Sequence, residues 1–363
     1  MPPKKPQSKK PWLRPVMIIG FILLNILVIA LTATAEFGNS KNAENFAHIK
    51  IDWWYLLPAA LAFVVAIIVE IYKYVLMMRE LGKRDKSYKA NKPWTTARRT
   101  VILGKYYDNV TPAAIGGQPF QIYYMRHHSG LPHGQSTSIP IFGMISGQLG
   151  FIIIAVFCFL FGSFTINNAP LIATACFGLL FYAFWPIAVM IATFLPKATT
   201  ELITLGVKAL AKMRIVKHRE KAIKKTELEV NDYAKCVKEI LKTKGLFLKT
   251  VALSIVFNSL VSMIPFFVLT AFGGDVDFIP CFVTTVAVTS AVYFVPTPGN
   301  AGAAEGTFFV VFSALSTGYV FWAMLFWRFF SYYIYIIMGP VTYFIMHLEK
   351  KRLENGSKKS QTT

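Results

Sequence analysis

The chain has 363 residues, of which 55% are apolar and only 15% are charged. Soluble domains average about a quarter charged residues, whereas the apolar surplus here lies in long blocks almost free of charge. The composition therefore excludes a soluble enzyme, a disulfide-stapled secreted domain and a disordered chain, and it predicts an all-α polytopic membrane protein. The net charge is +20. Because the basic residues flank the apolar blocks, this charge indicates membrane topology and contact with anionic lipid, and no nucleic acid partner is expected.

Some apolar blocks are long enough to cross about 30 Å of hydrocarbon, which takes roughly 20 helical residues. We predict six such crossings, over residues 15–35, 53–78, 139–161, 171–195, 250–272 and 319–348.

Two further stretches, 101–125 and 279–317, carry helix breakers in their middle. The first contains Thr111-Pro112 and Gly116-Gly117, and the second contains Pro296-Thr297-Pro298-Gly299. Non-helical backbone is tolerated at membrane depth only where protein or a wet cavity satisfies its polar groups. Both stretches are therefore predicted to be broken re-entrant hairpins.

Most Lys and Arg residues lie in an N-terminal arm (1–14), two loops (79–105 and 197–249) and a C-terminal tail (349–363). The positive-inside rule places all four in the cytoplasm. One hairpin then enters from each side of the membrane. The sequence thus predicts an inverted repeat of three transmembrane helices plus one broken re-entrant hairpin per half, with halves at about 15–161 and 171–348.

The basic loop 197–249 has apolar residues at helical spacing, with lysines between them. We expect amphipathic helices on the inner leaflet. A solvated helical hairpin that only sets the orientation of the chain is the alternative.

The two breaks share a pattern, T-P-x-x-x-G, and they supply polar groups at mid-depth. The N-terminus of a half-helix exposes free N–H groups and the positive end of the helix dipole, where a phosphate fits. A purely structural kink is the alternative at each break. The predicted substrate-binding residues are Thr111, Pro112, Gly116, Gly117, Gln118, Gln121, Gln148, Thr297, Pro298, Gly299, Gly302, Glu305 and Arg328.

Four ionisable residues are of special interest. Glu305 follows the second break and Arg328 lies well inside the last crossing. Ionisable groups at such depth are functional candidates. These two either pair with one another or hold a headgroup that carries both signs. Arg98 and Arg99 either recruit phosphate from the inner leaflet or only set topology.

Other polar residues within the crossings suggest contacts between helices. Glu70 and Lys73 are i, i+3 neighbours and are predicted to pair locally. Ser254, Asn258 and Ser262 form a stripe along one crossing. Such stripes bind helices together or line a polar path.

No catalytic residue, metal site or cofactor is predicted. The histidines at 127, 128 and 133 have no carboxylate or cysteine nearby at ligand spacing. The sequence contains no nucleophile elbow, P-loop or dinucleotide-binding motif.

Residues 109–121 and 296–305 resemble the two hallmark segments of the lysylphosphatidylglycerol synthase transmembrane-region family, and Trp327-Arg328 is also similar to that family. The resemblance covers roughly 15–348. It implies the flippase-like membrane domain found in the bacterial multiple peptide resistance factor. One departure concerns residues 117–121, which are uncharged here, whereas many relatives carry an acidic residue and an arginine in this motif.

The leading hypothesis is a flippase, passive or ion-coupled, that moves a phospholipid between leaflets of the bacterial plasma membrane. Its substrate would resemble lysyl-phosphatidylglycerol or be another anionic or polyprenyl-linked lipid. One alternative is a phosphatidylglycerol lysyltransferase that uses lysyl-tRNA, although we expect the soluble catalytic domain to be absent. Another is a non-transporting partner of a lipid or cell-envelope synthase. Membrane phospholipids and a second copy of the chain are the other expected partners.

Overall fold

The computed structural model describes residues 51–83, 90–114, 116–162, 166, 168–212, 243–316 and 319–360, with Ala30, Thr34 and single positions between 220 and 241. The predicted crossing at 15–35 lies outside this part of the chain except for Ala30 and Thr34. The N-terminal arm and most of 213–242 also lie outside it. Where it is described, the chain is helical and contains no strand, which confirms the all-α prediction.

Five stretches within the described ranges are long and apolar enough to cross a membrane. They confirm five of the six predicted crossings. Four are single helices, namely α3 (Trp53–Gly82), α6 (His133–Phe161), α7 (Ala169–Phe194) and α10 (Lys244–Ala271). The fifth, Val320–Glu349, is built from α13 (Val320–Arg328), a π-helical turn η4 (Phe329–Tyr333) and the first part of α14 (Ile334–Ser360).

Several helices are longer than their predicted crossings. Helices α6 and α10 each begin six residues before the predicted boundary, and α14 continues well beyond residue 348. Hydropathy marks only the part of a helix that lies in hydrocarbon. Polar residues at the ends continue the backbone hydrogen bonding without changing that signal.

Both predicted hairpins are broken where expected. The first consists of α4 (Pro93–Val110), η1 (Pro112–Ala114) and α5 (Gly117–His128). The second consists of α11 (Phe278–Val292), η3 (Pro298–Asn300) and α12 (Ala303–Ser313). Helix α4 begins eight residues earlier than predicted, because Pro93 occupies the first helical position, where its missing N–H costs nothing.

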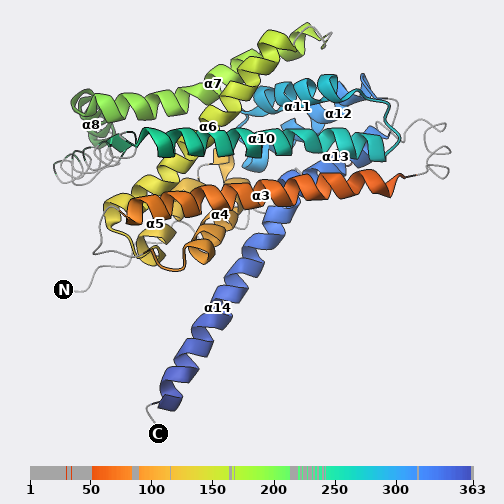
Figure 1. Ribbon diagram of the computed structural model, residues 1–363. Helices are drawn as coiled ribbons and strands as arrows, with labels where there is room; N and C mark the ends of the chain where they lie inside the picture. Colours follow the sequence, from red (N-terminus) through yellow and green to blue (C-terminus); the bar gives the residue numbers. More distant parts are fainter. Residues whose placement is uncertain are drawn as a thin grey trace.

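Helices α3 and α10 pack on one another and lie side by side (Figure 1). They are antiparallel, since the Asp52 amide before α3 donates to the Ala271 carbonyl at the end of α10, at 3.0 Å. The Tyr319 amide before α13 donates to the Phe272 carbonyl at 3.1 Å. The helix ends that are predicted to lie outside the cell therefore meet at one end of the bundle.

Packing partners recur along the chain. Helix α3 packs on α4 as α10 packs on α11, and α5 packs on α6 as α12 packs on α13. Helix α14 extends away from the bundle (Figure 1). This recurrence supports two similar halves, while their opposite sense in the membrane stays a prediction.

The outer surface is strongly apolar. Leu57, Leu160 and Leu180 are 66%, 68% and 73% exposed on three different long helices. An apolar surface spread over several helices suits contact with lipid chains rather than water. Helix α8 (Pro196–Lys212), at the beginning of the basic loop, also exposes Leu202 and Leu205.

Candidate functional site

The two breaks lie against one another. The 3-10 turn η1 packs on η3, and α4 also contacts η3. A Cβ atom built on Gly299 would collide with the Tyr332 ring and would lie 3.4 Å from Asn109 Oδ1. Residues from the two halves of the chain therefore meet at the interrupted helices, and the turns that contain Pro112 and Pro298 come together.

The second break is held by a buried ion pair. Gly299 and Gly302 have positive φ angles of 58° and 88°, which glycine adopts without strain. Arg328 Nε donates to Glu305 Oε1 at 2.6 Å, and its Nη2 donates to the Gly299 carbonyl at 3.2 Å. Glu305 Oε2 accepts from the Gly302 amide at 2.7 Å. The ring of Tyr332 lies 4.7 Å from the guanidinium carbon, so protein groups satisfy both buried charges.

The other polar side chains of the second break bond to nearby backbone. Thr297 Oγ1 donates to the Ala301 carbonyl at 2.9 Å, and Asn300 Nδ2 donates to the Val292 carbonyl at 3.1 Å. Pro298 begins η3. The π-helical turn η4 follows Arg328 directly. Such turns often mark functional sites, because they shift the register of the side chains that follow.

The first break is held by side chains of its own hairpin. Thr111 Oγ1 donates to the Tyr107 carbonyl at 2.7 Å and accepts from the Gly116 amide at 2.8 Å. Asp108 Oδ1 accepts from the Gly117 amide at 3.0 Å. Pro112 begins η1.

Carboxylates of the protein thus occupy the positions that we predicted for a phosphate. Asp108 bonds the first amide of α5, and Glu305 bonds the amide just before α12. A carboxylate at a helix N-terminus is stabilised by the same dipole that would attract a phosphate. A ligand anion at either position would have to displace it.

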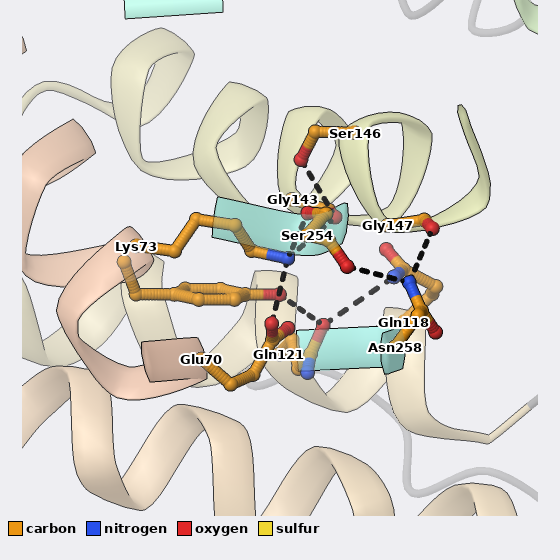
Figure 2. Close-up of polar contacts among 10 residues, drawn as sticks. Glu70, Lys73, Gln118, Gln121, Gly143, Ser146, Gly147, Ser254 and Asn258 are labelled. Atoms are coloured by element: carbon orange, nitrogen blue, oxygen red, sulfur yellow. Dashed lines mark hydrogen bonds and ion pairs between the residues drawn. The ribbon is translucent and has the colours of Figure 1, made fainter. Parts of the chain in front are cut away.

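A polar cluster lies beside the first break, near the middle of the long helices. We call it the five-helix cluster, because its residues come from α3, α4, α5, α6 and α10. Figure 2 shows its centre, the fully buried Lys73. The Nζ atom of Lys73 lies 2.8 Å from Glu70 Oε2, 3.1 Å from Ser254 Oγ and 3.3 Å from the Gly143 carbonyl. An ammonium has three protons to donate, and three acceptors surround this one.

The side chains of Gln118 and Gln121, both on α5, extend this cluster toward the break. Tyr74 Oη donates to Gln121 Oε1 at 3.3 Å, and Gln118 Nε2 donates to the same oxygen at 3.4 Å (Figure 2). Gln121 Nε2 donates to the Thr100 carbonyl at 3.4 Å. Gly104 makes room for this contact, because a Cβ atom there would overlap the Gln121 side chain.

On the opposite side of the cluster, Asn258 Nδ2 donates to the carbonyls of Gly147, at 3.2 Å, and Ser254, at 2.8 Å. The predicted stripe on α10 therefore does bind helices together. Within the part of the chain that is described, Gln118 Oε1 and Gln148 Oε1 are buried without a hydrogen-bond partner. Buried polar atoms usually have one, so these two acceptors are free for a ligand.

The arginines predicted to recruit phosphate differ from one another. Arg98 is exposed. Arg99 is occupied, because its Nη2 lies 2.6 Å from Glu349 Oε2 of α14. This ion pair also joins the beginning of α4 to α14. The charge pattern predicts that both of these segments lie in the cytoplasm.

Sequence reasoning missed two features of the site. It identified the Glu70–Lys73 pair, which the structure confirms, but not its partners on α6 and α10. It also gave no role to Asp108, which caps the beginning of α5. One signal in the sequence indicated that Lys73 needs partners on other helices. Lys73 is the twenty-first residue of a thirty-residue span, and therefore lies deep in the membrane. Among the described residues, no group of three metal-binding side chains occurs.

The family comparison can now be set beside this geometry. The family model for the lysylphosphatidylglycerol synthase TM region matches residues 17–339, a range that includes both breaks and the whole five-helix cluster. The chain belongs to this family. Searches of curated proteins and of solved structures gave no match. As a member of the lysylphosphatidylglycerol synthase TM-region family, the protein is a multi-pass membrane protein with a lipid-related role that contacts membrane phospholipids.

Proposed function

We propose that the protein is a lipid flippase of the bacterial plasma membrane. The end of α14 lies in the cytoplasm in this proposal. Its substrate is a phospholipid headgroup of the lysyl-phosphatidylglycerol type or another anionic or polyprenyl-linked lipid. The observation that carries this proposal is the meeting of η1 and η3 beside a polar cluster at the middle of the long helices.

The physical argument starts from the cost of moving a headgroup through hydrocarbon. An unsatisfied polar group in an apolar medium costs several kcal/mol, roughly 2–7. Broken helices and the five-helix cluster supply donors and acceptors halfway through the bundle, which lowers that cost. The apolar outer surface leaves the acyl chains in lipid while the headgroup passes.

The test is headgroup movement in vesicles that contain the purified protein. A fluorescent phospholipid is placed in both leaflets, and a membrane-impermeant reductant bleaches the outer one. Protein-containing vesicles should lose nearly all fluorescence, whereas protein-free vesicles should keep about the half that lies in the inner leaflet of any bilayer. Equal loss from both would overturn the proposal.

Two glycine variants form a matched pair for this assay. A side chain at Gly117 would meet the Asp108 carboxylate and the Gly104 carbonyl, so Gly117→Leu should close the first break and slow lipid movement. Gly306 has open space around it, so Gly306→Leu should retain the wild-type rate. Both variants must first show the wild-type melting temperature, because a folding defect would also slow movement. Glu305→Gln, which removes the charge opposite Arg328, serves as a second slow variant that adds no bulk.

A further inference from the structure

The charges of the five-helix cluster are unequally compensated. Lys73 has a carboxylate at 2.8 Å and two further acceptors. Lys105, on α4, differs from it. Among the described residues Lys105 has no hydrogen bond or ion pair, and its Nζ instead lies 5.6 Å from the centre of the Phe257 ring on α10. Its nearest acid in the sequence, Asp108, bonds the Gly117 amide.

The position of Lys105 is also unusual. Helix α4 packs mainly on α3, α5 and α14 rather than on α10, so the Lys105 side chain bridges two helices that are not packed together. Lys105 is only partly buried, as are Phe257 and Asn258 opposite it. It lies near enough to Lys73 for the two charges to repel one another.

Within the described part of the chain, Lys105 thus has a cation near it and no hydrogen-bonded or ion-paired partner, and Asp108, which attracts it, is engaged by the Gly117 amide. Together these observations favour an anion between α4 and α10. An ammonium on a flexible stem is a common ligand of phosphate. Asn258, which follows Phe257 on α10, lies beside Gln118 of α5 (Figure 2). Gln118 has a buried oxygen without a partner among the described residues, which can accept from a hydroxyl or ammonium of a headgroup. The half-helix termini are already capped, so Lys105 is the cation that remains available in this cluster.

We propose that Lys105 binds the phosphate of an anionic phospholipid during its passage between the leaflets. The inference rests on the proposed function and deepens it, because it names the headgroup charge and the group that recognises it. The negative charge of Asp108, which lies near Lys105, weakens the attraction between Lys105 and the phosphate. It thereby keeps binding reversible.

Binding is tested directly by native mass spectrometry of the purified chain titrated with phosphatidylglycerol or with zwitterionic phosphatidylcholine. The wild type should bind phosphatidylglycerol more tightly. Lys105→Gln should weaken that binding by about tenfold, the value expected for one lost charged hydrogen bond, while Lys105→Arg should retain it. Equal affinity for the two lipids, or unchanged affinity in Lys105→Gln, would overturn the inference.

Two further variants separate recognition from structure. Asp108→Asn keeps an oxygen for the Gly117 amide but removes the opposing charge, so it should tighten phosphatidylglycerol binding; weaker binding would contradict a role for Lys105 charge. Lys249→Gln removes an equal charge from an exposed position of α10 and should change affinity by less than about twofold, as exposed charges do. All variants should keep the wild-type melting temperature.

A competition experiment distinguishes the source of the phosphate. Failure of inorganic phosphate to displace phosphatidylglycerol supports a lipid ligand, whereas displacement supports the phosphate chemistry and assigns it to the soluble ion. Binding and movement are separate measurements. A protein that binds lipid through Lys105 without moving it would overturn the proposed function alone, whereas lipid movement with unchanged binding in Lys105→Gln would overturn this inference alone.

Discussion

Lys73 and Arg328 show how a membrane protein keeps cations in its interior. Each is less than about a twentieth exposed, and each has a carboxylate and a backbone carbonyl as partners. Such groups are stable only when paired and hydrogen-bonded, because an isolated buried charge is very costly. Both residues therefore fix the helices that supply their partners.

Helix α3 offers a matched comparison of a buried and an exposed ion pair. Lys73 pairs with Glu70 and Lys83 pairs with Glu80, both at 2.8 Å and both three residues apart, but the two lysine side chains are 1% and 70% exposed. We expect Lys73→Met to lower the free energy of unfolding by about 3–5 kcal/mol, because Glu70 is left without its partner. Lys83→Met should lower it by less than about 1 kcal/mol.

Reversible unfolding in mixed micelles measures both values. The double variant Glu70→Gln with Lys73→Met should recover part of the loss, since no unpaired charge remains. Similar losses in the two single variants would show that burial of the Lys73 pair does not govern stability.

At this scale the sequence predicts partners along one helix better than partners across helices. The Glu70–Lys73 pair follows from a spacing of three residues, and the Glu305–Arg328 pair follows from two charges in apolar surroundings. The contact of Lys73 with Ser254 joins residues 181 positions apart. It depends on how α3 and α10 pack, which no local pattern records.

At the scale of elements, close helix crossings depend on glycine. A Cβ atom on Gly150 of α6 would lie 2.8 Å from the backbone carbon of Ser254 on α10. Membrane helices pack closely through such small residues, since lipid provides no hydrophobic drive between them. The crossing also positions Asn258 to bond the Gly147 carbonyl.

Gly150→Ala should therefore separate α6 from α10 and lower the melting temperature. Gly306→Ala, within α12, meets no atom within 4 Å. It should be neutral or stabilising by up to about 1 kcal/mol, because alanine is the better helix former. Thermal unfolding of the two purified variants checks this, and a Gly150→Ala variant as stable as the wild type would argue against the close crossing.

Breaks and crossings could be predicted from sequence, whereas the form of the last crossing could not. Proline and glycine mark both hairpins because they remove donors and relax φ. The π-helical turn at Phe329–Tyr333 leaves no such mark, since it contains no proline or glycine and four of its five residues are aromatic.

At the scale of the whole molecule, the contacts between the ends of the helices agree with the predicted topology. Asp52, Phe272 and Tyr319 lie at one end of the bundle, and the Arg99–Glu349 pair joins two segments predicted to lie in the cytoplasm. The sequence predicts this grouping through its distribution of lysine and arginine. The contact between η1 and η3 also belongs to this scale, because it joins the two halves of the chain.

Cysteine labelling in intact cells tests the orientation. In a cysteine-free background, Lys83→Cys should react with a membrane-impermeant maleimide only after the cells are opened, and Asp275→Cys should react before. Both positions are exposed. Labelling of the two from the same side would contradict the inverted arrangement.

The carboxylate caps at the two breaks have a consequence for leakage. A small anion such as chloride can bind where a broken helix leaves its amides bare. Here Asp108 and Glu305 already fill those places, so a passing inorganic ion gains little by entering. If the protein moves lipids as proposed, the membrane would then remain an electrical barrier during that movement.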